Sequence, residues 1–386
     1  MAKNVTSCNV VSFVPTTAAP STDENPMSDR LSQYLAIDIP LIQAPMAGVS
    51  TPELAAAVSN AGALGSLGLG ASSVARAQEA IRRTRALTDR PFNVNLFCHA
   101  PPARDAAAEA AWVEVLRPQF ARFHAEPPAR LAEIYASFRG HREMLEMLLA
   151  ERPAVVSFHF GLPDAQTIAS LHDRGIMLAA TATCLDEARQ IRAAGIDMVI
   201  AQGIEAGGHR GTFDLNDVDY QSSTLALVQL LRPHLDIPLI AAGGIMDGAG
   251  IHAAMTLGAD GVQLGTAFLL CPESAADEGY RRALSAPGER RTWLTAAISG
   301  RPARCVDNAF CALGRRADPR AIAPYPLAYD AGKALATAAR AQGEEGYGAH
   351  WAGQGVNLLR EMPAAALIAA LREEYRRAAG QRSDRP

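Results

Sequence analysis

Long apolar segments are absent from this chain of 386 residues. No run reaches the roughly 18 to 20 residues that a helix needs to cross a bilayer, so we expect no membrane partner. Neither charge is in large excess, because 36 Lys and Arg face 40 Asp and Glu, with a net charge of -4 at pH 7. Since nucleic-acid binding usually requires a basic patch or stripe, we expect no nucleic-acid partner either.

Cysteine motifs are also missing. None of the six cysteines forms a C-x-x-C pair and no Cys/His spacing resembles a zinc site, so we expect no metal. Scattered thiols in a chain of this length are typical of a reducing compartment, which predicts a cytoplasmic protein. The six are Cys8, Cys98, Cys184, Cys271, Cys305 and Cys311.

The first residues have little capacity to pack. Residues 1–27 are mostly polar and rich in proline, and we expect a disordered tail there. The apolar piece from Val10 to Val14 is shorter than the roughly 7 to 15 residues of a signal-peptide core. The sequence therefore predicts no secretory signal.

Short apolar runs alternate with helical patterns along the rest of the chain. Most of these runs lack polar alternation, as expected of strands that are buried on both faces. Helical periodicity marks the segments Thr51–Ala61, Cys184–Ala194 and Gly248–Leu257. The eight predicted strands are Pro40–Ala44, Ala63–Leu67, Phe92–Leu96, Val155–Phe158, Ile176–Ala180, Met198–Ala201, Pro238–Ala241 and Gly261–Leu264.

Eight strands, mostly followed by helices, predict an α/β protein with a (β/α)8 TIM barrel. The alternative is an open doubly wound sheet, which would gather the functional residues at one switch point. The barrel is favoured because candidate residues follow many different strands. We expect the barrel to span residues 28–274, with a helical insertion at 100–150. A C-terminal helical segment, 275–386, is expected to pack over the barrel mouth as a lid or second subdomain.

The segment from Gly203 to Gly211 carries the most informative motif. It follows the sixth predicted strand, and the pair Gly207-Gly208 lets the backbone approach a phosphate or a planar ring closely. His209 lies in the same turn, where an imidazole can move a proton near neutral pH. We therefore predict His209 as the catalytic base.

Other polar groups lie near strand ends. Alternation places Asn93 and Asn95 on one face of the third strand, where Asn95 can bond a ligand ring or both amides can fill the barrel as partnered polar groups. His159 ends the fourth strand as a candidate substrate residue, although a histidine between aromatics is more often a core residue. Arg210 either attracts an anionic substrate or pairs with Glu205.

Glycine loops follow the seventh and eighth predicted strands, at the position where barrels commonly bind a phosphate group. With the glycine pair before His209, these loops predict a phosphate cradle that needs no lysine. Gln263, in the eighth strand, can hydrogen-bond another part of the same ligand. The glycines of this predicted cradle are Gly207, Gly208, Gly243, Gly244 and Gly265.

Four motifs in order carry a family resemblance. The loop Gln43–Gly48 after the first strand, Ser157–Gly161, Gly203–Gly211 and Gln263–Leu269 resemble the nitronate monooxygenases, formerly called 2-nitropropane dioxygenases. The resemblance implies tightly held, non-covalent FMN with its phosphate on the glycine cradle and Thr266. It also implies His209 as the base, Pro45 and Met46 behind the isoalloxazine, and Asn95 and Gln202 near the flavin or its chain.

The activity implied by the resemblance is oxidation of alkyl nitronates by O2 to a carbonyl compound and nitrite, with nitroalkanes as a wider substrate range. The alternative is an FMN-dependent NAD(P)H enoyl or quinone reductase on the same barrel. A flavin-binding protein without turnover stays open as well. A flavin-free aldolase is disfavoured, because the predicted strands contain no lysine for a Schiff base. The expected assembly is a monomer or homodimer.

Overall fold

A closed barrel of parallel strands forms the centre of the molecule. The computed structural model describes residues 30–102 and 104–380, so the tail predicted at residues 1–27 lies outside the described residues. The barrel strands are β1 (Leu41–Gln43), β2 (Gly65–Gly68), β3 (Phe92–Phe97), β4 (Val155–His159), β5 (Met177–Ala182), β6 (Met198–Gln202), β8 (Leu239–Ala242) and β9 (Gly261–Leu264).

Their order is β1-β9-β8-β6-β5-β4-β3-β2, with every pair parallel. A parallel bridge between Ile42 and Leu64 joins β1 to β2 and closes the sheet. The predicted (β/α)8 barrel is therefore confirmed, and the open doubly wound sheet is excluded. All eight strands overlap the predicted runs.

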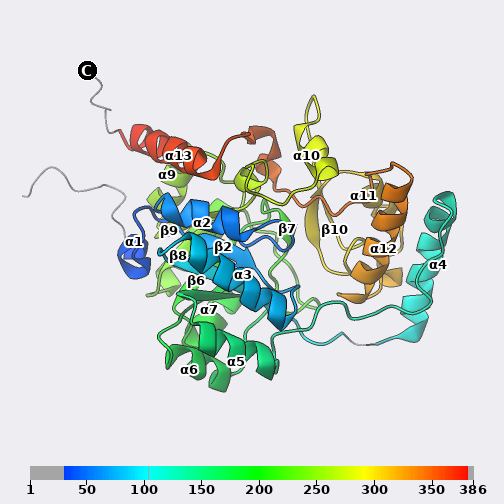
Figure 1. The fold of residues 1–386 in the computed structure, drawn as a ribbon, viewed down its shortest axis with the longest axis horizontal. Helices are drawn as coiled ribbons and strands as arrows, with labels where there is room; N and C mark the ends of the chain where they lie inside the picture. Colours follow the sequence, from blue (N-terminus) through cyan, green and yellow to red (C-terminus); the bar gives the residue numbers. More distant parts are fainter. Residues whose placement is uncertain (1–29, 103, 381–386) are drawn as a thin grey trace, which may run out of the picture.

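Helices surround the barrel (Figure 1). Those that follow or connect its strands are α2 (Pro52–Asn60), α3 (Val74–Leu87), α5 (Arg142–Glu151), α6 (Ala165–His172), α7 (Leu185–Ala193), α8 (Thr224–Leu231) and α9 (Gly248–Thr256). Local chemistry sets their ends. Thr51, for example, caps α2 by accepting a hydrogen bond of 2.9 Å from the backbone N–H of Leu54.

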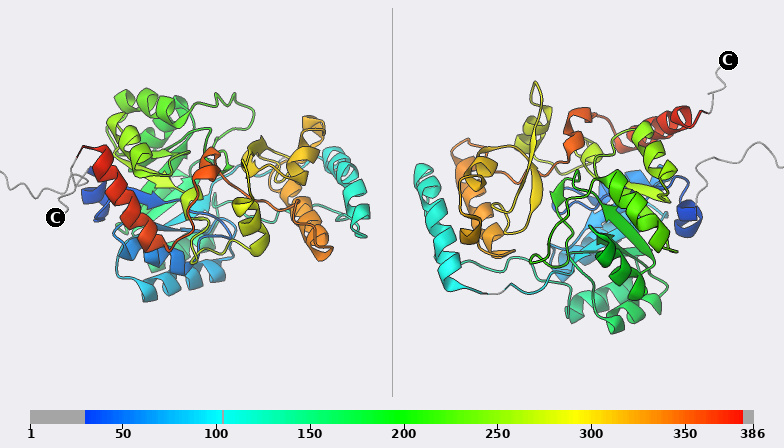
Figure 2. Two further views of the ribbon diagram at one scale, coloured as in Figure 1. Left: turned by 90° about the horizontal axis from the view of Figure 1, so that it is seen from above. Right: turned by 180° about the vertical axis from the view of Figure 1, so that it is seen from behind.

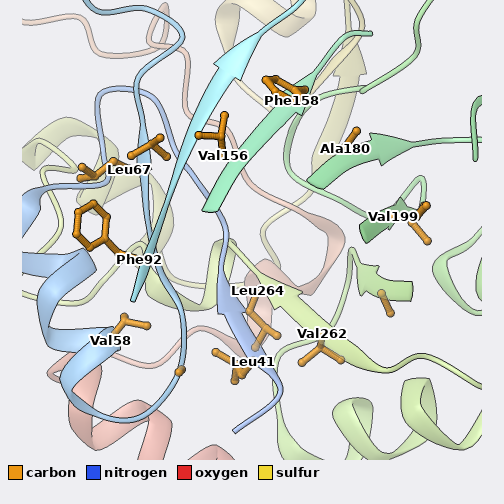
Figure 3. Close-up of a cluster of buried hydrophobic side chains, with 14 of the residues drawn as sticks. Leu41, Val58, Leu67, Phe92, Val156, Phe158, Ala180, Val199, Val262 and Leu264 are labelled. Carbon is orange, nitrogen blue, oxygen red and sulfur yellow. The ribbon is translucent and has the colours of Figure 1, made fainter. Parts of the chain in front are cut away.

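The main core lies between the strands and this ring of helices. Outward-facing strand residues such as Leu41, Val156 and Val262 are almost fully buried, and Figure 3 shows them around the barrel with Val58 of α2. Burial of each such side chain stabilises the fold by about 1.5 to 3 kcal/mol. A smaller cluster packs Leu31 of α1 (Arg30–Leu35) among barrel residues.

A second core joins the insertion to the C-terminal segment. Trp112 and Phe120 of α4 (Ala106–Arg122) are buried against Phe310 and Leu335. Figure 2 shows α4 beside the C-terminal helices and away from the barrel. The C-terminal helices are α10 (Glu278–Ser285), α11 (Ala309–Gly314), α12 (Leu327–Ala341) and α13 (Ala364–Ala378), with 3-10 turns at Pro319–Ala321 and Gln354–Leu358. Two further 3-10 turns, Arg232–His234 and Thr266–Phe268, belong to the barrel.

The C-terminal segment differs from the helical expectation because it also contains strands. β10 (Thr292–Thr295) pairs antiparallel with β11 (Ala303–Val306), and β11 pairs with β7 (Gly208–His209). These strands are too short to show a clear period in the sequence. The pairing of β11 with β7 matters for the candidate site, because it fixes the backbone position of His209. Helix α13 returns to the barrel and packs against α9 and α2.

Candidate active site

A cavity of about 1230 Å³ opens at the carboxyl ends of the barrel strands. This is where barrels place their functional residues, and its volume is large enough for a cofactor together with a small substrate. Every predicted site residue except Arg210 lines it. These residues are Pro45, Met46, Asn95, His159, Gln202, Gly207, Gly208, His209, Gly243, Gly244, Gln263, Gly265 and Thr266.

The loop after β1 forms one wall of this cavity. Ser50 holds it in shape, because its hydroxyl accepts hydrogen bonds from the backbone N–H of Met46 (3.0 Å) and from Nε2 of Gln43 (2.9 Å). Gly68 at the end of β2 packs directly on this loop. A Cβ at Gly68 would lie 2.6 Å from the backbone N of Ala47, so only glycine allows the contact.

The predicted phosphate cradle is built from turns that suit glycine. Gly208, Gly243 and Gly244 have φ values of +73°, +123° and +72°, a region that other residues rarely adopt. Thr266 faces the same cavity, and its Oγ1 accepts a hydrogen bond of 2.9 Å from the backbone N–H of Gly353. The C-terminal segment therefore also contacts the predicted cradle, which the sequence assigned to the barrel alone.

The backbone of His209 is fixed by two barrel side chains. Its carbonyl oxygen accepts hydrogen bonds from Nε2 of Gln202 (2.9 Å) and Nε2 of His159 (3.2 Å). Because a carbonyl only accepts, His159 carries its proton on Nε2, and its Nδ1 accepts from Oγ1 of Thr181 at 3.0 Å. His159 thus supports His209 while it lines the cavity.

The ring of His209 lies among aromatic side chains. Its centroid is 5.0 Å from that of Trp351 and 5.6 Å from that of Tyr325. Burial lowers the pKa of His209 to about 3, and the charges of His159 and Arg301 lower it further. The imidazole of His209 is therefore neutral throughout the physiological pH range.

Three histidines with desolvated rings, one buried and two half-buried, make the fold sensitive to acid. Burial lowers the pKa of His99 and of His159 to about 4 and that of His209 to about 3, against roughly 6.5 when unfolded. The unfolded chain thus binds more protons below about pH 6.5, and the free energy of unfolding falls as the pH drops toward about 4. The expected slope is up to about 1.4 kcal/mol per pH unit for each histidine.

Urea unfolding at a series of pH values measures this slope. His99→Gln should reduce it by the contribution of about one proton, whereas His234→Gln, at an exposed position, serves as the control. A slope that is the same in all three proteins would contradict the prediction.

The two asparagines of β3 have different places. Asn95 lines the cavity, and its Nδ2 donates to Oγ (3.0 Å) and the carbonyl oxygen (3.1 Å) of Ser157. Asn93 lies outside the cavity lining and donates to Oγ of Ser66 at 3.1 Å. Asn93 therefore fills the barrel as a polar group, whereas Asn95 remains available to a ligand.

Arg210 does not lie where a substrate residue should. It is buried, forms an ion pair of 2.9 Å with Asp219, and donates to the carbonyl oxygens of Gln202 and Gly203. It is absent from the cavity wall, and its partner is Asp219 rather than Glu205. The substrate role predicted for Arg210 is therefore corrected to a structural one, because its charge is already neutralised.

Sequence reasoning missed the wall that the distant segments supply. Tyr135 of the insertion and Tyr325, Tyr329, Lys333 and Trp351 of the C-terminal segment line the same cavity. The Nζ atom of Lys333 lies 4.9 Å from the ring centroid of Tyr135 and 5.4 Å from that of Tyr329. Lys333 is one of two lysines in the whole sequence, and this rarity was the available indication.

A second polar cluster lies outside the cavity. Ligand atoms of Asp277, Glu345 and His350 lie within 4.8 Å of one another, but both carboxylates are already paired. Asp277 contacts Arg340 at 3.1 Å and Glu345 contacts Arg282 at 2.8 Å. We assign no ion to this cluster.

No helix among residues 30–102 and 104–380 is long and apolar enough to span a membrane. The fold and the cavity define the class of barrel enzymes, with glycine turns and a half-buried neutral histidine at the cavity wall. The "Nitronate monooxygenase" family model matches residues 28–374. The chain belongs to the nitronate monooxygenase family, whose members are oxidoreductases and, in general, flavoenzymes.

Individual relatives agree with this assignment. The chain is 59% identical to a nitronate monooxygenase of Paraburkholderia phytofirmans, over 91% of this chain and 96% of the relative. It is 53% identical to a nitronate monooxygenase of Pseudomonas aeruginosa, over 91% of this chain and 100% of the relative.

Solved structures show the same fold. A nitroalkane oxidase from Streptomyces ansochromogenes has a TM-score of 0.83 at 41% identity, covering 91% of this chain and 99% of that one. FabK from Thermotoga maritima is more distant, with a TM-score of 0.70 at 28% identity, covering 92% of this chain and 97% of that one.

Proposed function

We propose that this protein oxidises alkyl nitronates with O2 to a carbonyl compound and nitrite, with FMN as its cofactor. The observation that carries the proposal is the charge pattern of the cavity. Lys333 has no carboxylate partner among the described residues, and it faces the same cavity as the neutral His209. A cation at a cavity wall without a counter-ion attracts an anion, and a nitronate is a small anion.

The cavity residues fit a flavin phosphate. Oε1 of Gln263 is buried at the cavity wall without a hydrogen-bond partner, so it needs an N–H or O–H donor such as a flavin ring or ribityl chain offers. The glycine turns leave backbone close to the cavity for a phosphate. We propose that these turns and Thr266 hold the phosphate, while Pro45, Met46, Asn95 and Gln202 lie against the ring or chain. When bound, FMN supplies the electron transfer to oxygen.

The low pKa of His209 favours nitronates over neutral nitroalkanes. A nitroalkane must first lose a proton from carbon, and proton transfer is slow when the base is weak. A nitronate has already lost this proton. We therefore propose that His209 removes the carbon proton from the less favoured nitroalkanes and contributes packing and polarity to nitronate binding.

An absorbance spectrum of the purified protein is the first test. We expect flavin peaks, and FMN in the supernatant after heat denaturation. Anaerobic mixing with ethylnitronate should bleach or shift these peaks, whereas NADPH alone should leave them unchanged.

Other outcomes would redirect the assignment. Bleaching by NADPH alone would identify the enoyl or quinone reductase alternative. Flavin that reacts with neither compound would indicate a binding protein without turnover, and a protein that neither carries nor binds flavin would overturn the cofactor. We further propose that the protein works in the cytoplasm as a monomer or homodimer, consistent with its free thiols.

A further inference from the structure

We infer that Ser299 is a positioning residue that sets the tautomer of His209, so that Nδ1 is the nitrogen that receives the substrate proton. This inference rests on the proposed function, in which His209 is the base. Ser299 lies in the turn between β10 and β11, outside the four motifs that predicted the site. Its side chain is fully buried.

Ser299 is held firmly beside the histidine. Its Oγ lies 2.9 Å from Nε2 of His209, and β11, which follows its turn, pairs Ala303 with His209. The next residue, Gly300, has φ of +87°, and its Cβ position lies 2.6 Å from the carbonyl oxygen of Ala323. Only glycine fits there, so the turn has little freedom to move Ser299 away.

The hydrogen-bond count around this hydroxyl decides the tautomer. Ser299 has one proton to donate, and the carbonyl oxygen of Arg301 accepts from it at 3.1 Å. If Ser299 turned its proton toward His209, the carbonyl oxygen of Arg301 would lose the hydrogen bond that Ser299 donates. Because Arg301 is buried, such a loss is unfavourable. The arrangement that satisfies both bonds has Nε2–H of His209 donating to Ser299.

The other ring nitrogen is then the base. With the proton on Nε2, Nδ1 of His209 carries the free lone pair. Among the described residues Nδ1 has no hydrogen-bond partner, and it is not among the buried unpartnered atoms. Since His209 lines the cavity, we infer that Nδ1 reaches the cavity space. It would accept a proton from the α-carbon of a nitroalkane, leaving the nitronate and an imidazolium whose Nε2–H stays on Ser299.

The tautomer can be measured without activity. In holoenzyme labelled with 15N-histidine, two-bond 1H–15N spectra distinguish Nε2–H from Nδ1–H, and His209→Asn identifies the signals of His209. We expect Nε2–H in the unaltered protein, a mixed or inverted tautomer in Ser299→Ala, and restored Nε2–H in Ser299→Thr.

Kinetics give the second readout. In Ser299→Ala, kcat/KM for nitroethane should fall about tenfold or more, because the lone pair is misplaced for proton removal, while that for ethylnitronate should change much less. Ser59→Ala is the matched control, since Ser59 is a buried serine with two hydrogen bonds outside the cavity.

Nδ1–H in the unaltered protein would overturn the inference. So would a Ser299→Ala protein with an unchanged tautomer and an unchanged nitroethane rate. The spectral results do not depend on whether nitronates are the natural substrates, because the spectra report the protonation of the ring itself. Conversely, the expected tautomer in a protein that does not oxidise nitronates would sustain the role of Ser299 and remove only the proposed reaction.

Discussion

Replacing Lys333 with methionine should raise the KM for ethylnitronate between about ten- and a hundredfold and change kcat much less. The reason is electrostatic. At a partly desolvated site one favourable charge pair at about 4 Å contributes a few kcal/mol, and Lys333 faces the cavity without a carboxylate partner among the described residues. Methionine keeps most of the chain length and removes only the charge. Steady-state kinetics at low and high salt measure the effect.

Three controls separate charge from packing. Lys333→Arg keeps the charge and should retain most of the affinity. Arg340→Met removes a charge from the same helix, α12, but Arg340 pairs with Asp277 outside the cavity, so the KM should stay nearly constant. Nitroethane, which is neutral, should show little effect in Lys333→Met. An equal rise in KM for nitroethane and ethylnitronate would contradict an electrostatic role.

The His209→Asn variant should lose about a hundredfold or more of its kcat/KM for nitroethane and much less for ethylnitronate. A general base contributes about 10² to 10⁴ to proton transfer, and only the nitroalkane requires this step. Asparagine preserves polarity and approximate size but cannot act as the base. Parallel assays of nitrite release with both substrates measure the ratio.

His172→Asn provides the matched control for this variant. His172 bonds Asp197 at 3.0 Å, away from the cavity, so its loss should affect stability without changing the ratio of the two substrates. An equal loss on nitroethane and ethylnitronate in His209→Asn would reject the assignment of His209 as the base. The flavin content of each variant should be measured first, so that a cofactor defect is not mistaken for a chemical one.

Much of the barrel was predictable because the relevant forces are local. Unalternating apolar runs such as Met198–Ala201 mark strands buried on both faces, and the cap at Thr51 and the glycines that end helices need only neighbouring residues. The short strands β7 and β11 were not predictable in this way. Each contains four residues or fewer, and their pairing joins positions almost a hundred residues apart.

The site residues also form two groups: those that a local sequence pattern identifies and those that only contacts distant in the chain identify. Gly207, Gly208 and His209 could be found from sequence because they form one turn with a local conformational requirement. Arg210 follows them directly, yet its role depended on Asp219 in a later loop. Ser299 lies outside the four main motifs, and only its distance to the ring of His209 indicates its part.

The sequence by itself therefore determined the barrel, the glycine turns and the position of the histidine beside them, since periodicity and backbone conformation are properties of neighbouring residues. The tertiary structure alone decided which residues of the insertion and the C-terminal segment line the cavity, the burial that lowers the pKa of His209, and the lack of a carboxylate partner for Lys333 among the described residues. Burial and charge pairing are sums over groups that are distant in the chain, so they are defined only once the insertion and the C-terminal segment have packed together over the barrel.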